Sequence, residues 1–233
     1  MTGNSVAFAR RTKLYFASGL CLAGLLLSGC STPAEPNEET SGAAWQISAD
    51  ELESQLKEFV KDDPKAKVIS DAKLRESIPE AQAWIEGLNV SPSKCGVTFA
   101  APVTEQLAKS KMAAVQFDDR YLTVAVYQDI QALKNQWESE AKASAECARY
   151  SVTSDGKTRA YHLAKQSLKT KSELNDAYVV TSSDGSTTQQ QLVIRAARGN
   201  VMIGFQQETS AKQTQEQLQH GAERIDALFE ELK

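Results

Sequence analysis

The sequence predicts an α+β domain, with one antiparallel β-sheet of about five to seven strands and α-helices packed on one of its faces. Two kinds of pattern support this fold class. Strand-length segments with alternating apolar residues are joined by turn dipeptides such as Asp155-Gly156 and Asp184-Gly185. Segments with apolar residues at three- and four-residue spacing lie before, between and after these strands. Runs of hairpins flanked by helices are typical of α+β domains.

The first helix is expected to begin at Ser48-Ala-Asp-Glu51, which has the pattern of a capping box. The apolar residues that follow it fall on one helix face, and Asp62-Asp63-Pro64 ends the pattern. A second, short helix is expected to start at Pro79, because proline suits the first turn of a helix. That helix carries Trp84, Ile85 and Leu88 on one side.

A hairpin and a long helix are expected next. Ala113, Val115 and Phe117 alternate with other residues, as do Leu122, Val124 and Val126, with a turn at residues 118–120 between the two runs. Residues 129–147 then carry apolar or small residues at helical spacing, including Leu133 and Trp137. Cys147 lies at the end of this helix.

The C-terminal half predicts three hairpins and a final amphipathic helix over residues 210–232. We expect Ser183 to pair with Ser186, and Arg198 to pair with Val201 around Gly199-Asn200. These two registers bring apolar residues to one common sheet face, which a one-residue slip would destroy. That face holds Val179, Leu192, Ile194, Ala196, Val201, Ile203 and Phe205. The opposite face shows Gln189, Gln191 and Arg195 and is expected to be polar.

The N-terminus, residues 1–29, is interpreted as an export signal. Arg10, Arg11 and Lys13 precede an apolar run at residues 14–27 that is too short to span a bilayer. Leu27-Ser28-Gly29-Cys30 resembles the bacterial lipobox, and this resemblance implies cleavage before Cys30 and a diacylglyceryl group on its sulfur. The alternatives are an ordinary signal peptide or an uncleaved anchor. Acylation would hold the chain at the cell membrane, on the extracytoplasmic face.

Residues 30–44 are expected to form a flexible tether, because they lack large apolar side chains, and residues 45–233 a single globular domain. All 30 acidic residues follow Cys30. Without the three basic residues of the signal, 23 basic residues remain, so the mature chain carries a net charge near −7. An acidic chain without a basic stripe is a poor candidate for nucleic-acid binding.

Two cysteines, Cys95 and Cys147, remain once Cys21 leaves with the signal and Cys30 is acylated. In an oxidising compartment a single even pair predicts a Cys95–Cys147 disulfide, with free thiols or a metal site as the alternatives. The absence of Cys-x-x-Cys spacing and of nearby histidines argues against a metal, and no cofactor is implied.

The order of these elements resembles a group of actinobacterial envelope domains, the extracellular sensor domains of PknH-type serine/threonine kinases and related lipoproteins. The resemblance rests on Pro92-Ser-Lys-Cys95, on the hairpin and the helix at 129–147 with Trp137, and on the strand pair at Arg198-Gly199-Asn200 before a final helix. It covers most of residues 50–232. Members usually carry two disulfides, whereas this chain has cysteines for one. The resemblance implies binding of an envelope ligand in a cleft beside the sheet.

No residues are assigned to catalysis. His162 is interpreted as a partly exposed strand histidine and His220 as a solvated helix residue, with catalysis as the weaker alternative. Nucleophilic catalysis needs a serine or cysteine beside a base, and the sequence has no G-x-S-x-G motif that would indicate such a serine. Asp118-Asp119 lacks the spacing of a calcium-binding loop. Trp84 and Trp137 are expected to pack in the core, although either could line an apolar cleft, and Trp45 is expected to pack at the domain edge.

The sequence therefore predicts a non-enzymatic, lipid-anchored binding or sensor-like module with a small-molecule, lipid or glycan ligand. The first alternative is a structural or assembly lipoprotein that recruits an envelope protein partner, for which the Gln-rich segments 189–191 and 206–207 are a candidate surface. The second alternative is an enzyme with an unrecognised site. A binding module predicts an apolar pocket, and a recruiting protein predicts a broad exposed patch. An enzyme predicts a cleft with acids of strongly shifted pKa.

Overall fold

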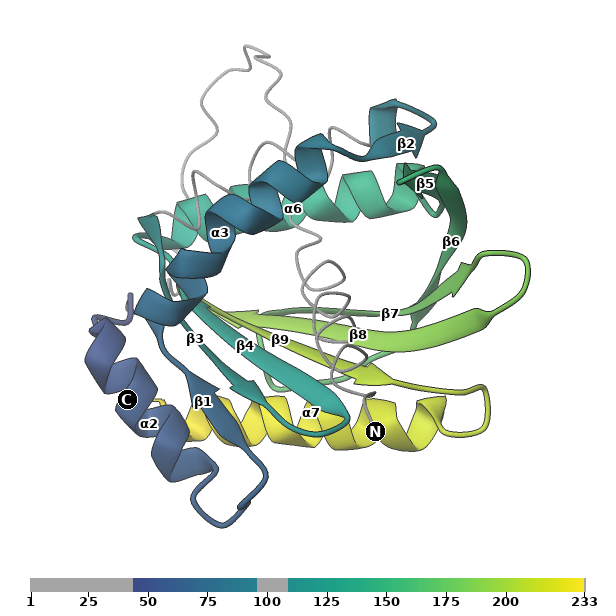
Figure 1. The fold of residues 1–233 in the computed structure, drawn as a ribbon. Coiled ribbons are helices and arrows are strands. Elements are labelled where there is room, and N and C mark those ends of the chain that lie inside the picture. The colour runs from purple at the N-terminus through teal and green to yellow at the C-terminus, as the bar shows by residue number, and fades with distance from the viewer. Residues whose placement is uncertain (1–43, 96–108, 233) are drawn as a thin grey trace, which may run out of the picture.

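The computed structural model describes residues 44–95 and 109–232, and its centre is one antiparallel sheet of nine strands in the order β1-β3-β4-β9-β8-β7-β6-β5-β2 (Figure 1). The strands are β1 (Lys67–Ile69), β2 (Asn89–Ser91), β3 (Lys111–Gln116), β4 (Arg120–Val126), β5 (Arg149–Ser154), β6 (Lys157–Gln166), β7 (Leu174–Ser183), β8 (Thr188–Arg198) and β9 (Val201–Glu208). The fold class is α+β, as predicted, but the sheet is larger than the expected five to seven strands. The additional strands β1 and β2 have three residues each, too few to produce a readable alternation.

In the described part of the chain, four helices accompany the sheet: α2 (Ala49–Phe59), α3 (Asp71–Glu86), α6 (Ile130–Glu146) and α7 (Thr214–Glu231). The predicted capping box at Ser48 and Glu51 is present at the start of α2. The prediction that a helix starts at Pro79 is wrong, since α3 begins after Ser70 and includes Pro79. The Ser70 hydroxyl accepts the N–H of Lys73 and caps the helix, whose first residue, Asp71, is eight residues before Pro79.

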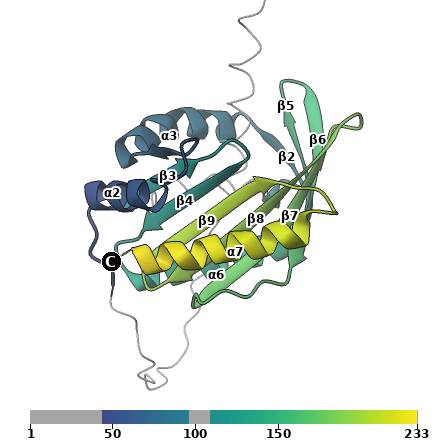
Figure 2. The same cartoon turned by 90° about the horizontal axis from the view of Figure 1, so that it is seen from below.

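Helices cover both faces of the sheet, which corrects the expectation of a single covered face. Helices α2 and α7 pack on one face, here called the α7 face, and α3 and α6 lie on the other, the α6 face (Figures 1 and 2). On the α6 face, Leu133 and Trp137 of α6 pack with Met112, Ala125 and Ala197. The small alanine side chains lie on strands that are buried on both faces, which leaves room for a helix against this side of the sheet as well.

The main hydrophobic core lies on the α7 face. It consists of strand residues that meet Leu218, Ile225, Leu228 and Phe229 of α7 and Leu52 and Leu56 of α2. All seven residues predicted for a common apolar face belong to it: Val179, Leu192, Ile194, Ala196, Val201, Ile203 and Phe205. The predicted pairing of Arg198 with Val201 is confirmed.

The turn between β7 and β8 differs from the predicted two-residue turn. Ser183 pairs with Thr188 rather than with Ser186. The Asp184 carboxylate accepts the N–H groups of Ser186 and Thr187 at 3.0 and 2.8 Å, which closes a four-residue loop. The shift in register is two residues, so every side chain keeps its predicted face. The turn at Asp155-Gly156 has positive φ at both residues, as a type I′ turn requires.

Across residues 44–95 and 109–232, no helix combines the length and the apolar composition needed to cross a membrane.

Candidate functional site

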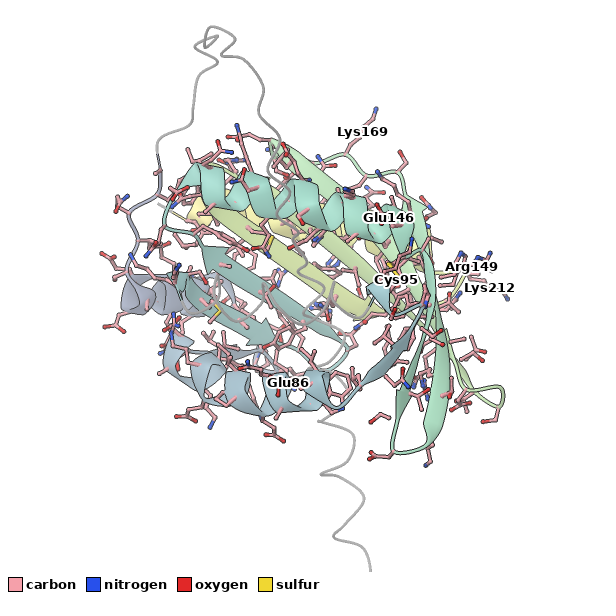
Figure 3. The ribbon with its side chains drawn as sticks, turned by 90° about the horizontal axis from the view of Figure 1, so that it is seen from above. Glu86, Cys95, Glu146, Arg149, Lys169 and Lys212 are labelled. Atoms are coloured by element: carbon pink, nitrogen blue, oxygen red, sulfur yellow. A yellow bond between two sulfur atoms is a disulfide. The ribbon has the colours of Figure 1, made fainter. Side chains whose placement is uncertain are left out.

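The predicted disulfide joins Cys95 to Cys147, with their Cα atoms 5.7 Å apart. Cys95 follows β2 by four residues, and Cys147 caps the C-terminus of α6, two residues before β5 begins. The bond therefore ties α6 to the segment that follows the edge strand β2 (Figure 3). The other predicted modification site, Cys30, lies outside the described residues.

A polar trough lies on the α7 face where strands β2, β5, β6 and β7 extend beyond the cover of α7. The register sets two rows of neighbouring side chains across these strands. One row is Ser91, Ser151, Ala160 and Ser183, each directly opposite the next. The second row is Arg149, His162 and Thr181. Since opposite residues in an antiparallel pair project on the same side of the sheet, the two rows form one surface.

The trough has a volume of about 410 Å³, and all of its lining residues except Ala160 carry polar groups, although carbon atoms contribute most of its surface. Small residues of the first row leave space beside the larger Arg149 and His162. Tyr150 and Tyr161 also border the trough, but their side chains project to the opposite face and stack with ring centroids 5.0 Å apart. Among the described residues, no acidic side chain lines the trough. The volume is within the range of about 300–1,000 Å³ that is usual for ligand sites. A binding module was expected to have a pocket lined by apolar side chains, whereas most of the lining residues here are of polar types.

The side chains of Arg149 and His162 have no ion-pair or hydrogen-bond partner among the residues that the structure describes. Arg149 is exposed, whereas His162 is half-buried in β6, as the sequence predicted for a strand histidine. Thr181 accepts a hydrogen bond from the Gln190 amide at 3.4 Å, and Ser183 accepts the N–H of Gly185 at 3.2 Å. The trough therefore offers unpaired N–H donors beside several hydroxyl groups.

A second polar cluster, here called the Arg195 cluster, is buried between the sheet and α6. It consists of Arg195, Glu140, Asp176 and Gln136, which are between 2% and 8% exposed. The Arg195 guanidinium contacts Glu140 and donates two hydrogen bonds to the oxygens of Asp176, at 3.0 and 2.6 Å. Gln136 donates to the second oxygen of Glu140 at 2.6 Å.

The Arg195 cluster has two carboxylates and one guanidinium, so it carries a net negative charge when both acids are ionised. Burial raises the pKa of Asp176 to about 7, and this effect outweighs the opposing influence of Lys165 and of the Tyr178 hydroxyl. The positive charge of Arg195 stabilises a buried carboxylate, but this single charge is shared between the carboxylates of Glu140 and Asp176. Burial also raises the pKa of Tyr178 to about 12.

The trough and the Arg195 cluster lie on opposite faces of the sheet. His162 belongs to the α7 face, with Thr181 and Val179, whereas Asp176 and Arg195 belong to the α6 face. The histidine and the paired carboxylates are therefore separated by the sheet and do not form one acid–base site. Both oxygens of Asp176 are also engaged by Arg195.

Sequence reasoning placed Arg195 on an exposed polar face and did not identify the cluster. A signal was present, because Glu140 lies three and seven residues after Trp137 and Leu133 and so falls on the buried stripe of α6. A charged residue on such a stripe needs a buried partner, and Arg195, which lies within the apolar stretch 192–197 of β8, is the matching charge.

The other candidate residues have varied surroundings. Trp137 is buried, as predicted. The Trp45 ring meets the Phe229 ring edge-on, with 6.3 Å between the ring centroids. The prediction of core packing is wrong for Trp84, which is 43% exposed on α3. His220 is exposed on α7, as predicted. The Gln-rich segments do not form one exposed surface, since Gln206 and Gln207 are buried.

The acidic pair Asp118-Asp119 is held by neighbouring side chains. Asp118 forms a salt bridge with Lys65 at 2.9 Å, and Asp119 accepts a hydrogen bond from Gln207 at 2.9 Å. In the part of the chain that the structure describes, no group of three or more His, Cys, Asp or Glu side chains could hold a metal ion.

No protein-family model matches the sequence, and no curated protein matches it either. Among solved structures, the extracellular domain of PknH from Mycobacterium tuberculosis aligns over 61% of this chain and 78% of its own, with a TM-score of 0.43 and 15% identity. An uncharacterized protein of Mycobacterium smegmatis aligns over 76% of this chain and 95% of its own, with a TM-score of 0.43 and 13% identity. The extracellular domain of PknH is thus among the solved structures that this fold resembles.

Proposed function

We propose that this protein is a lipid-anchored, extracytoplasmic binding module that does not catalyse a reaction, and that its ligand site is the trough at the end of the α7 face. The observation that carries this proposal is the trough itself, a volume of about 410 Å³ lined by hydroxyl groups, Arg149 and His162. The lining residues include no carboxylate and no cysteine, and among the described residues no hydrogen bond joins His162 to a serine or threonine of the lining. This arrangement supports a role without catalysis, because a hydroxyl nucleophile needs such a base within hydrogen-bond reach.

An extracytoplasmic location is supported by two independent features. The sequence Leu27-Ser28-Gly29-Cys30 resembles a lipobox after a short apolar run. The Cys95–Cys147 bond is of a kind that persists in oxidising compartments and is rare in the cytosol. Replacement of Cys30 by alanine should move the protein out of the membrane fraction after cell lysis and sedimentation. Unchanged retention of the variant in that fraction would contradict the anchor.

The binding proposal is tested by filling the trough. In Ala160→Trp the indole occupies the floor of the trough, on an exposed strand position where it displaces no core residue. The full-length protein, extracted from membranes in mild detergent, is examined by native mass spectrometry for a co-purified small molecule. We expect a bound mass in the wild type that is lost in Ala160→Trp.

The matched control is Ala227→Trp, which makes the same exchange on the exposed side of α7, away from the trough. It should keep the bound mass. Equal occupancy in both variants would show that the ligand lies elsewhere, and the absence of any bound mass in the wild type would count against a tightly held ligand in the trough.

Recruitment of an envelope protein is the second candidate, and the exposure of Trp84 favours it. Among the described residues, Trp84 is the one large apolar side chain that is exposed, at 43%. Tryptophan is enriched among residues that contribute most to protein–protein binding. Chemical crosslinking in intact cells should give a defined protein adduct that Trp84→Ala abolishes, if recruitment is the function.

A further inference from the structure

We propose that the ligand of the trough is a polyhydroxylated molecule with an anionic group, a phosphate or a carboxylate, and that this group is bound between Arg149 and His162. The inference rests on the proposed function, because it names the class of ligand for the same site. An anionic sugar has both features that the trough can recognise.

The position of the anion follows from the register of β5 and β6. Arg149 and His162 are directly opposite each other, so their side chains leave neighbouring positions on the same face. Arginine presents N–H groups in a planar fork that matches carboxylate and phosphate oxygens, and an imidazole ring always provides at least one N–H donor. Both residues line the trough, and neither has a partner in the described part of the chain.

The charge of the lining supports an anion rather than a neutral or cationic ligand. The protein as a whole is acidic, with 30 acidic and 26 basic residues, so a lining with a basic residue and no acid does not follow from composition. Glu146, an acid three residues before Arg149, has its carboxylate 3.9 Å from the ammonium group of Lys94. Lys212, which precedes α7, lies at the same edge of the molecule as Arg149 in the view of Figure 3.

The hydroxyl groups of the lining account for the remainder of the ligand. Ser91 and Ser151 are directly opposite each other, and Ala160 continues their row, so small side chains form a floor beside the two basic residues. Each hydroxyl can donate one hydrogen bond and accept two, which suits the hydroxyl groups of a polyol. A ligand with an anion alone would leave this row without contacts.

The test uses ligand-observed NMR with the full-length protein in detergent micelles. The probes are glucose 6-phosphate and glucuronate as anionic sugars, glucose as the neutral counterpart, inorganic phosphate, and short-chain dihexanoyl-phosphatidylglycerol as a lipid headgroup. Line broadening or saturation transfer reports binding of each probe. We expect both anionic sugars to bind more tightly than glucose and inorganic phosphate.

Two variants examine the assigned residues. Arg149→Gln and His162→Gln should each weaken binding of glucose 6-phosphate, by about tenfold for Arg149, which is the loss expected for a charge-assisted hydrogen bond. The control is Lys157→Gln, which also removes one positive charge from the β5–β6 hairpin but at a position of the opposite face. It should leave the affinity within about twofold, because surface charges at a distance are screened by salt.

The outcomes separate the two proposals. If glucose binds as well as glucose 6-phosphate and Ala160→Trp prevents both, the trough is a ligand site but the anionic class is wrong. If no probe binds, or if binding of the anionic sugars survives Arg149→Gln unchanged, the inference is overturned. If glucose 6-phosphate binds and dihexanoyl-phosphatidylglycerol does not, the anionic group belongs to a soluble or polymeric glycan. If only the lipid binds, the anionic group belongs to a lipid headgroup. Either result is consistent with an anion site between Arg149 and His162.

Discussion

Replacement of Arg195 by methionine should destabilise the protein strongly. Methionine is close in length to the arginine stem, so the packing against α6 is largely kept, but Glu140 and Asp176 lose their common positive partner. These two side chains are 2% and 6% exposed. Removal of one partner from a buried ion pair costs about 3–5 kcal/mol, because the remaining charge stays in a low-dielectric surrounding. For a domain with a total stability of about 5–15 kcal/mol, this is a large fraction.

The opposite change within the same cluster should have a small effect. Glu140→Gln removes the surplus negative charge, while Arg195 keeps both hydrogen bonds to Asp176. The amide oxygen of the new glutamine can still accept a hydrogen bond from Gln136. The free energy of unfolding should change by less than about 1 kcal/mol, or increase, since a neutral pair replaces a buried cluster with net charge.

Urea unfolding followed by far-ultraviolet circular dichroism measures both variants at neutral pH. Arg198→Met is the matched control, because Arg198 lies at the end of the same strand and its salt bridge partner Glu230 is exposed. Exposed pairs contribute about 0–1 kcal/mol, so this variant should unfold close to the wild type. A loss below about 1 kcal/mol for Arg195→Met, or an equal loss for Glu140→Gln, would refute the argument that unbalanced buried charge determines stability here.

Three further predictions concern stability. Because burial raises the pKa of Asp176 from 3.8 to about 7, the folded state keeps its proton between these values while the unfolded chain loses it, so the free energy of unfolding should fall as pH rises from about 4 to about 7. Urea titrations across this range should show a smaller slope for Asp176→Asn, and an unchanged slope would contradict the assignment. Replacement of both Cys95 and Cys147 by alanine should lower the free energy of unfolding by about 4 kcal/mol, because the unfolded chain regains the entropy of a loop of about 50 residues. A reductant should destabilise the wild type by a similar amount and leave the variant unchanged. Gly221→Ala should lower the free energy of unfolding by about 1–3 kcal/mol, because the new Cβ would lie 2.5 Å from Cδ1 of the buried Ile194. This loss should exceed the gain from the higher helix propensity of alanine. A rise in the midpoint of thermal unfolding would show that the core repacks freely.

The hairpins of the C-terminal half could be predicted because their alternation has period two and their turns use residues with a clear preference. The pairing of Arg198 with Val201 and the set of seven core residues followed from these patterns. The β7–β8 loop was predicted two residues too short, since an Asp-Gly pair is compatible both with a two-residue turn and with a loop closed by the aspartate side chain. Short edge strands such as β1 contain too few residues to show any period.

The packing of helices on the α6 face was harder to predict. A helix whose buried side carries both polar and apolar residues does not show which face of the sheet it packs against. Helix α3 has no fully buried residue among its 16, and α6 buries Gln136 and Glu140 beside Leu133 and Trp137. Sequence reasoning took Arg195 as evidence of a solvated face, whereas the structure places Glu140 above it as a counter-charge. The pairing joins residues 55 positions apart, and neither element alone specifies it.

The disulfide bears on the trough more directly than on the core. Strand β2 pairs with β5 over three residues, and Ser91 is the last of them. An edge strand of this length has few hydrogen bonds to hold it, so its position beside Ser151 depends on what anchors its ends. Cys95 follows Ser91 by four residues, and Cys147 precedes Arg149 by two, so one covalent bond fixes the two strands that supply the hydroxyl and the guanidinium of the proposed site. Since the main core is built from α2, α7 and the strands β3, β4, β7, β8 and β9, loss of this bond should impair ligand binding before it exposes the core.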